Sequence, residues 1–308
     1  MIQFYRALSR ALALSVSFLA LSCNSPDSGK AQSEGNLAVN GDPQSAEALF
    51  WRKKPSSPPN PPSPAPTPVV TATPVPSTGR KYSTDVMIFN GAGTNASDAQ
   101  SLIDIVASHG LTYHVIDSTQ LNSMSAAAIS DHGVLVWPGG DSNVMDASFT
   151  SDTRLRVYQA VHDYGVSFTG FCAGAWIAVG PPPGSQAPYW GFSIVAGSYL
   201  KEYYPNAQIV SGGVIVPITF ANATVRDLVW WQGPFLPSLP GGIIAKYSTG
   251  EAAIVESWSG KGYVTISGVH PEAPQSWRYG LVDPDGLDFD VAWSMINSAL
   301  TKTPLQVF

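Results

Sequence analysis

The segment Gly170-Phe171-Cys172-Ala173-Gly174 decides how the rest of the chain is interpreted, because it joins two different sequence patterns. Residues 166–171 form a short apolar run typical of a buried strand, and residues 173–179 are compatible with a helix. A cysteine at this junction lies on a tight turn, where flanking glycines let neighbouring backbone approach without a Cβ clash. The helix start offers unpaired N–H groups and a positive dipole end, which favour the thiolate. We therefore interpret Cys172 as a candidate nucleophile, with a buried structural cysteine as the alternative.

The residues before Cys172 alternate between strand and helix patterns. Apolar runs at 85–89, 111–116, 133–137 and 166–171 are separated by segments with helical spacing at 97–108 and 152–164. This order predicts βαβ units and a mostly parallel sheet sandwiched by helices. Ligand sites in such sheets lie beyond the carboxyl ends of the strands. Both Cys172 and the loop Pro138-Gly139-Gly140-Asp141 fall at such ends.

The residues after Cys172 are richer in strand signals. These lie at 208–220, 242–247, 252–258 and 262–267, and a helix is expected from about residue 290 to 300. The predicted fold class is therefore α/β, with added β elements in the C-terminal half.

A histidine and a carboxylate follow the last predicted strand, in Ser267-Gly-Val-His270-Pro-Glu272. A histidine can accept and return the proton of a cysteine nucleophile, and a nearby carboxylate can fix its tautomer. A histidine satisfied within the core is the alternative for His270. For Pro138-Gly139-Gly140-Asp141 the alternative is a simple turn after a strand.

The N-terminal part has a different character. Residues 1–22 carry Arg6 and Arg10, an apolar run and small residues, which predicts a secretory signal peptide. The end of this segment, Ala20-Leu21-Ser22-Cys23, resembles the lipobox of bacterial lipoproteins, in which the cysteine is acylated. An ordinary signal peptide or an uncleaved anchor is the alternative. If Cys23 is lipidated, Cys172 is left as a thiol.

Three regions follow from composition. Residues 1–22 are the predicted signal peptide, residues 23–82 a Pro/Ser-rich disordered tether, and residues 83–308 one folded domain. The tether has ten prolines between Pro55 and Pro76 and cannot bury enough apolar surface to offset its ordering entropy. We therefore expect a protein of the bacterial cell envelope, lipid-anchored and facing the periplasm or the cell surface.

Charge and acidic motifs limit the expected partners. The formal net charge is −6, it becomes −8 once Arg6 and Arg10 are removed, and no basic stripe is present, so we expect no nucleic-acid partner.

Residues 283–290 place acidic side chains at alternating positions, as calcium loops do, but they lack the closing glutamate. A turn followed by an acidic N-cap is the favoured interpretation. We expect no metal and no cofactor.

Taken together, these residues resemble the class I glutamine amidotransferase-like superfamily, in which a Cys on a strand-to-helix elbow works with a late His-x-Glu. The closer resemblance is to the biotin-protein ligase N-terminal domain family, through the segments at Trp137–Asp141, Gly170–Ala175 and Ser267–Glu272 and the aromatic stretch 230–235. It covers about residues 83–300. The resemblance implies a flavodoxin-like sheet and a triad of Cys172, His270 and Glu272.

The same resemblance implies further roles. The oxyanion hole would come from backbone N–H groups at Gly139, Gly140 and Ala173, and the substrate pocket would contain Asp141, Trp176, Trp231 and Gln232. Trp176 stands four residues after the nucleophile, where amidotransferases that use glutamine usually carry Gln. We therefore expect an envelope cysteine amidohydrolase or amidotransferase-like enzyme acting on a small-molecule or peptide-like amide or acyl substrate. A catalytically silent ligand-binding module of the same fold is the alternative.

Overall fold

The computed structural model describes residues 81–182, 190–205 and 212–308. The predicted signal peptide, Cys23 and the predicted tether up to residue 80 lie outside these residues, as do positions 208–211 of one predicted strand. Within the described part of the chain, none of the helices combines the length and the apolar character needed to cross a membrane.

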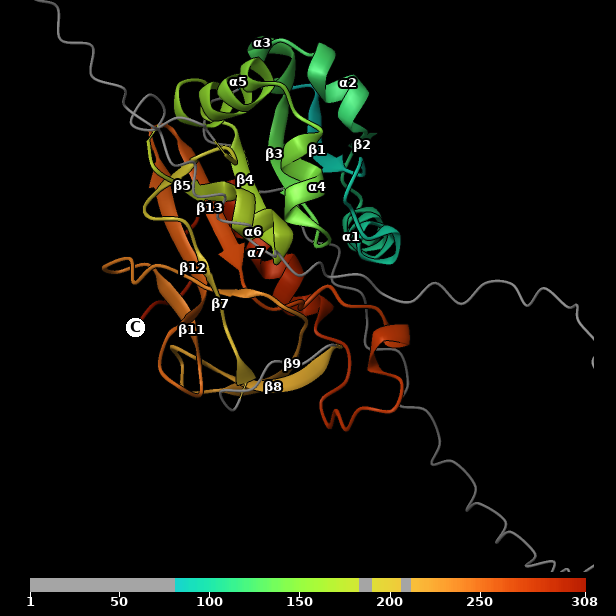
Figure 1. Ribbon diagram of the computed structural model, residues 1–308, viewed down its shortest axis with the longest axis vertical. Helices are drawn as coiled ribbons and strands as arrows, with labels where there is room; N and C mark the ends of the chain where they lie inside the picture. The colour runs from blue at the N-terminus through green and yellow to red at the C-terminus, as the bar shows by residue number, and fades with distance from the viewer. Residues whose placement is uncertain (1–80, 183–189, 206–211) are drawn as a thin grey trace, which may run out of the picture. The chain divides into compact units, whose positions relative to one another are not determined.

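The secondary structure alternates between strands and helices up to α6 and is dominated by strands after it (Figure 1). The first half contains β1 (Thr84–Phe89), α1 (Ala96–Ser108), β2 (Tyr113–Ile116), α2 (Ser118–Ser123), α3 (Ala126–Ile129), β3 (His132–Trp137), α4 (Ser142–Ala147), α5 (Ser151–His162), β4 (Ser167–Phe171) and α6 (Ala173–Ala178). The second half contains β5 (Val179–Gly180), β6 (Val195–Ala196), β7 (Lys201–Glu202), β8 (Val214–Phe220), β9 (Val225–Trp230), β10 (Pro234–Phe235), β11 (Ile243–Tyr247), β12 (Ala252–Ser259), β13 (Gly262–Ser267), the 3₁₀ turn η2 (Gln275–Arg278) and α7 (Phe289–Thr301).

The described residues form a central nine-stranded sheet in the order β2-β1-β3-β4-β13-β12-β11-β8-β9. The first five strands are parallel, and the last four continue the sheet in antiparallel fashion. The predicted fold class, a mostly parallel α/β sheet with added β elements, is confirmed. Strands β3, β4 and β13 are direct neighbours, so the three loops that leave their carboxyl ends start side by side.

Helices cover both faces of the parallel part of the sheet (Figure 1). Residues of α2 to α6 share one apolar core with the side chains on one face of the sheet, such as Phe89 and Trp137. Residues of α1 and α7 share a second core with the other face, such as Ile88 and Val136. Strand β3 is therefore buried at every position, which explains why residues 134–137 form a continuous apolar run.

Local sequence fixes where several helices begin. Asn95 accepts hydrogen bonds from the Ser97 and Asp98 N–H groups and so caps α1. Asp117 and Gln120 form a reciprocal capping box at the start of α2. Helices α2, α3 and α4 were not predicted, because runs of four to six residues are too short to show helical periodicity.

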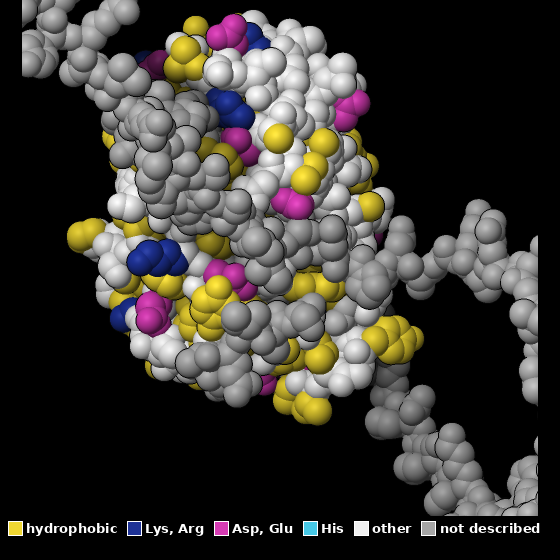
Figure 2. All heavy atoms as spheres, viewed as in Figure 1, with side chains coloured by type: hydrophobic (Ala, Val, Ile, Leu, Met, Phe, Trp, Pro, Cys, Tyr) yellow, Lys and Arg dark blue, Asp and Glu magenta, His cyan; other side chains and the backbone are white. Residues whose placement is uncertain are grey.

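Strand β9 was also not predicted. Its sequence, Val225-Arg-Asp-Leu-Val-Trp230, mixes charged and apolar residues, and it lies at the edge of the sheet. An edge strand pairs on one side only, so exposed Val225 and charged Arg226 are tolerated there. On the face of the molecule drawn in Figure 2, basic and acidic side chains of the described residues are interspersed, and several lie next to one another.

Candidate functional site

Cys172 connects β4 to α6 with an unusual backbone conformation. Its φ of 44° and ψ of −101° are outside the regions that L residues normally occupy. Two bonds fix it there: the Cys172 N–H donates to the Ser267 carbonyl at 2.8 Å, and its own carbonyl accepts from the Trp176 N–H at 2.9 Å. A strained nonglycine residue persists only where the surrounding structure enforces it, which is a mark of functional sites.

The flanking glycines are required by close backbone contacts. A Cβ on Gly170 would lie 2.7 Å from the Gly174 carbonyl carbon, and a Cβ on Gly174 would lie 2.4 Å from the Trp137 carbonyl oxygen. The turn can therefore press α6 against the end of β3 only if both positions are glycine.

His270 and Glu272 lie beside this turn, on the loop that follows β13. The His270 Nδ1 and a Glu272 carboxylate oxygen are 2.8 Å apart, and both side chains are completely buried. The backbone N–H of His270 donates to the Val229 carbonyl at 2.8 Å, which ties this loop to β9. Because the Nδ1 proton is held by the carboxylate, Nε2 is the ring nitrogen left to act on a neighbour.

The electrostatic environment favours a charged imidazole. Burial, the largest single effect, lowers the pKa of His270, but the charges of Cys172 and Glu272 and the hydrogen bond to Glu272 raise that pKa well above its usual range. Nε2 has no partner at ordinary hydrogen-bond geometry among the described residues. We therefore attribute the effect of Cys172 on the imidazole chiefly to charge. The Cys172 Sγ also lies 3.5 Å from the Trp231 carbonyl oxygen.

The loop after β3 approaches the same site. Gly139 lies against the histidine: a Cβ there would be 2.5 Å from His270 Cε1. The Gly139 N–H already donates to the Asp98 carboxylate, so it is not available to a substrate oxygen. The N–H groups of Gly140 and Ala173, by contrast, have no acceptor among the described residues. Gly140 has a φ of 144°, a conformation that requires glycine.

Asp98 is part of the site although sequence analysis did not select it. It lies in the first turn of α1, is completely buried, and places one carboxylate oxygen 3.8 Å from His270 Nδ1. The signal was present in the sequence: Asp98 occupies the same helical face as Leu102 and Ile105, where an apolar residue is expected.

Asp98, His270 and Glu272 bring three possible ligand atoms within 4.8 Å of one another. Such a set of nitrogen and oxygen atoms could in principle hold a metal ion. Here, however, the His270 and Glu272 atoms are hydrogen-bonded to each other, and Asp98 accepts from Gly139.

The predicted pocket residues differ in their placement. The Trp231 carbonyl contacts the thiol, and the next residue, Gln232, has a φ of 53° and a buried side-chain oxygen without a hydrogen-bond partner among the described residues. Trp176 is half-buried on α6. Asp141 instead caps α4, because its carboxylate accepts from the Asn143 and Val144 N–H groups at 3.0 and 3.1 Å.

A second residue that sequence analysis missed, Trp277, covers the histidine. Its ring packs edge-on against His270 at a centroid distance of 5.1 Å and against Trp231 at 5.3 Å. Its indole N–H donates to the Ser97 hydroxyl at 2.9 Å, which links η2 to the start of α1.

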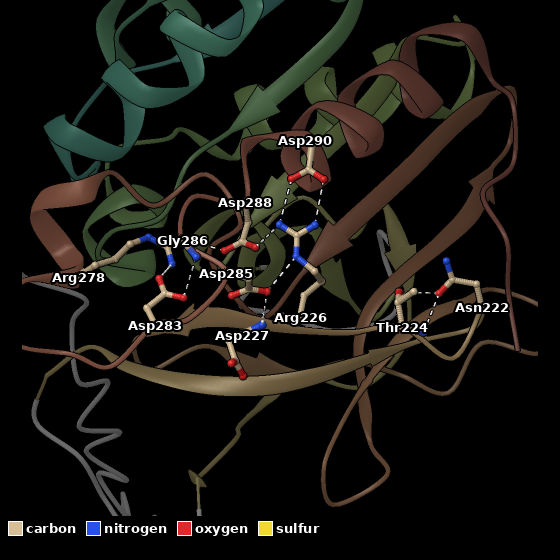
Figure 3. A network of polar contacts seen from close by, with 10 residues as sticks. All are labelled: Asn222, Thr224, Arg226, Asp227, Arg278, Asp283, Asp285, Gly286, Asp288 and Asp290. Atoms are coloured by element: carbon tan, nitrogen blue, oxygen red, sulfur yellow. Dashed lines mark hydrogen bonds and ion pairs between the residues drawn. The ribbon is translucent and has the colours of Figure 1, made fainter. Parts of the chain in front are cut away.

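An ion-pair network holds the segment that carries Trp277 (Figure 3). Arg226 of β9 binds three carboxylates of the segment 283–290, at Asp285, Asp288 and Asp290, with distances of 3.0, 2.7 and 2.9 Å. Arg278, next to Trp277, binds Asp283 and Asp288. Asp288 occupies the N-cap position of α7, in agreement with the acidic N-cap predicted from the sequence. Its carboxylate makes no capping bond, because both arginines bind it. The aspartates at alternating positions of residues 283–290 are therefore ion-paired with Arg226 and Arg278.

Comparisons with known proteins identify similar solved structures. No family model matches the chain, and no curated protein matches it. A glutamine amidotransferase structure is 18% identical, covering 63% of this chain and 95% of its own, with a TM-score of 0.42. A putative GMP synthase component from Thermoplasma acidophilum is 12% identical, covering 70% and 96%, with a TM-score of 0.44. A cytoplasmic protein of Salmonella typhimurium is 10% identical, covering 68% and 98%, also with a TM-score of 0.44.

Proposed function

We propose that the described domain is a cysteine hydrolase or transferase of the amidotransferase-like kind, acting on an amide or related acyl group. The observation that carries the proposal is the convergence of three loops. A strained cysteine, a histidine whose pKa is raised by that cysteine and by a carboxylate, and a glycine loop meet at adjacent carboxyl ends of β3, β4 and β13.

The proposed chemistry starts from a Cys172 thiolate and a His270 imidazolium. The sulfur attacks the substrate carbonyl carbon, and a C–S bond forms while the carbonyl oxygen becomes an oxyanion. The N–H groups of Gly140 and Ala173 would stabilise that oxyanion, where each donor is worth about 10² to 10³ in rate. The carbon–nitrogen bond then breaks, and His270 gives its proton to the leaving amine.

The second half returns the site to its starting state. Neutral His270 takes a proton from water or from a small acceptor as its oxygen or nitrogen attacks the thioester carbon. The C–S bond breaks and the Cys172 thiolate is restored beside the imidazolium. Glu272 keeps Nδ1 protonated throughout, so that Nε2 faces the reaction.

The resemblance to the biotin-protein ligase N-terminal domain family remains part of the proposal. Trp176 stands where a glutamine-using enzyme usually has Gln, so the proposed substrate is an amide or acyl compound other than free glutamine. The rings of Trp231 and Trp277 pack against each other, and Trp277 also packs against His270, so this pair would supply flat apolar surface for such a compound.

A thiol reactivity assay tests the proposal. The full chain is treated with iodoacetamide at about neutral pH, and alkylation of Cys172 is followed by peptide mass spectrometry, which separates it from Cys23. We expect Cys172 to react faster than an ordinary thiol, and His270→Ala to remove the advantage. Labelling no faster than a model thiol in the wild-type protein would count against the proposal.

One observation favours the second candidate, a ligand-binding module without turnover. Cys172, His270 and Glu272 all have an exposed fraction of 0%. A substrate would have to displace covering groups to reach the sulfur. If Cys172→Ala retains ligand affinity and full biological effect, the binding module is the better description.

We also propose that the chain is held at the cell envelope by a lipid on Cys23, with residues 23–82 as the tether. The sequence pattern supports this, and residues 23–80 lie outside the described ones. Incorporation of a labelled fatty acid should be lost in Cys23→Ser. Unchanged incorporation would contradict the anchor.

A further inference from the structure

Gln232 combines two features that both cost stability. Its φ of 53° lies in the left-handed region, which glycine or asparagine usually occupies. Its side-chain oxygen is buried without a hydrogen-bond partner among the described residues, and the residue has an exposed fraction of only 5%. A buried acceptor without a donor loses its hydration and gains nothing in return. Such local costs concentrate at functional sites, where a ligand compensates for them.

Gln232 lies next to the sulfur that is proposed to react. The Trp231 carbonyl oxygen is 3.5 Å from Cys172 Sγ, and it belongs to the same peptide group as the backbone nitrogen of Gln232. The bonds of one peptide group separate that oxygen from that nitrogen, so the Gln232 nitrogen lies within about 6 Å of the sulfur. A glutamine side chain that starts there is long enough to reach a compound bound at the sulfur.

The backbone that carries Gln232 is fixed by its neighbours. A Cβ on Gly233 would lie 1.7 Å from the Gly268 carbonyl oxygen, so this loop packs directly against the loop after β13. The Gly233 carbonyl accepts from the Tyr203 N–H at 3.0 Å and from the Trp230 indole N–H at 3.1 Å. The strained conformation of Gln232 is therefore imposed from both sides, and its amide group is held ready for a ligand.

Donors and acceptors come from different loops of the site. The N–H groups of Gly140 and Ala173, which have no acceptor among the described residues, are those proposed to hold the oxyanion. The loop after β9 instead contributes two acceptors, the Trp231 carbonyl and the Gln232 side-chain oxygen. A carbonyl oxygen can only accept a hydrogen bond. A compound that brings no donor to Gln232 leaves the buried oxygen unpaired, and sites of this kind reject such compounds.

We propose that Gln232 is a specificity-determining residue, the side-chain oxygen of which accepts a hydrogen bond from an N–H or O–H group beside the reacting carbonyl of the substrate. The inference rests on the proposed function and deepens it, because the compound recognised is the one that Cys172 attacks. It narrows the substrate class to compounds that carry such a donor, and it excludes simple esters that have none.

Two alkylating reagents test this recognition in the full chain. Iodoacetamide carries N–H donors beside its carbonyl, whereas methyl iodoacetate has the same reactive carbon and carbonyl but no donor. The rate of Cys172 alkylation by each reagent is divided by the rate of a free model thiol, which removes the intrinsic reactivity of the reagent. The quotient of the two corrected rates is the amide preference. We expect an amide preference of about tenfold in the wild type, the effect of one hydrogen bond to a buried acceptor.

Three variants show whether Gln232 is the source of the preference. Gln232→Met has a similar length and only a weak acceptor, so it should lower the amide preference about tenfold. Gln232→Glu keeps a side-chain oxygen and should retain the preference. Gln306→Met, at an exposed glutamine near the end of the chain, is the control and should match the wild type.

Thermal unfolding without any ligand separates recognition from a structural role. The Gln232 oxygen has no partner to lose among the described residues, so Gln232→Met should keep or raise the unfolding temperature. A glutamine that holds the fold together would instead lower that temperature by several degrees when it is replaced. Gln232→Leu repeats the measurement with a different shape, so a decrease in only one of the two variants is a packing effect.

The outcomes separate this inference from the proposed function. No amide preference in the wild type, an unchanged preference in Gln232→Met, or lower unfolding temperatures in both Gln232→Met and Gln232→Leu overturns the role of Gln232. If the preference is absent while His270→Ala loses its fast labelling, Gln232 recognises nothing and the cysteine–histidine proposal stands. If Gln232→Met fails to fold, Gln232→Leu supplies the preference and the unfolding temperature. If Cys172 of the wild type reacts no faster than a model thiol, the proposed function fails, and the amide preference still tests Gln232.

Discussion

Replacing Gly139 with alanine is expected to disturb both the stability of the domain and the reactivity of Cys172. The new Cβ would lie 2.5 Å from His270 Cε1 and 2.6 Å from an Asp98 oxygen, and both of those side chains are completely buried. Carbon atoms normally approach to about 3.5 Å, so the neighbours must move by roughly 1 Å. Gly139 does not have a positive φ, so alanine fits its backbone and the whole effect is steric.

The magnitude follows from these distances. Overfilling a packed interior costs about 1–3 kcal/mol. For a domain of this size that corresponds to a decrease of roughly 2–12 °C in the unfolding temperature. Displacing the imidazole by about 1 Å is expected to slow Cys172 alkylation by about 10²-fold.

Thermal unfolding and the iodoacetamide rate measure the two effects separately. Gly212→Ala is the control, because a Cβ at Gly212 would meet nothing within 4 Å. In a His270→Ala background, Gly139→Ala should cost less stability, since the ring that the methyl group would strike is gone. If Gly139→Ala unfolds and reacts like the wild type, the close approach of this loop to His270 is refuted.

Three further results are expected. Asp141→Ala should lower the unfolding free energy by about 1 kcal/mol through loss of the α4 cap and leave Cys172 alkylation unchanged; a large loss of reactivity would place Asp141 in the pocket after all. Arg278→Met should cost about 3–5 kcal/mol in denaturant unfolding because it removes the arginine partner of Asp283 and leaves buried Asp288 with Arg226 alone, whereas exposed Lys201→Met should cost little; equal effects would mean that the network is dispensable. Burial raises the pKa of Asp288 to about 6 despite the opposing arginines, so the folded state binds that proton more tightly than the unfolded chain does. The unfolding free energy should therefore decrease as the pH rises from about 4 to about 6. Asp288→Asn should remove that part of the slope, and an unchanged slope would contradict the assignment.

Much of the fold could be predicted because its signals are local. Strands β1 and β3 contain uninterrupted apolar runs at residues 86–89 and 134–137, and β4 and β13 are rich in apolar residues, since these strands are buried in the middle of the sheet. The glycines around Cys172 indicated a tight turn, and the turn is there. Short helices and edge strand β9 could not be found in this way, because their stability comes from caps and neighbours and their sequences have no clear period.

The sequence alone was enough to place the candidate site residues at strand ends. A glycine loop, a cysteine and a histidine with a carboxylate each follow a predicted buried strand, and the apolar pattern locates those strands. Only the tertiary structure decided which of these ends are neighbours. The β3-β4-β13 adjacency brings residues more than a hundred positions apart into contact, and α1 and η2 then add Asp98 and Trp277. No local pattern encodes such contacts, because burial, charge and hydrogen bonding of a side chain depend on every element that packs around it.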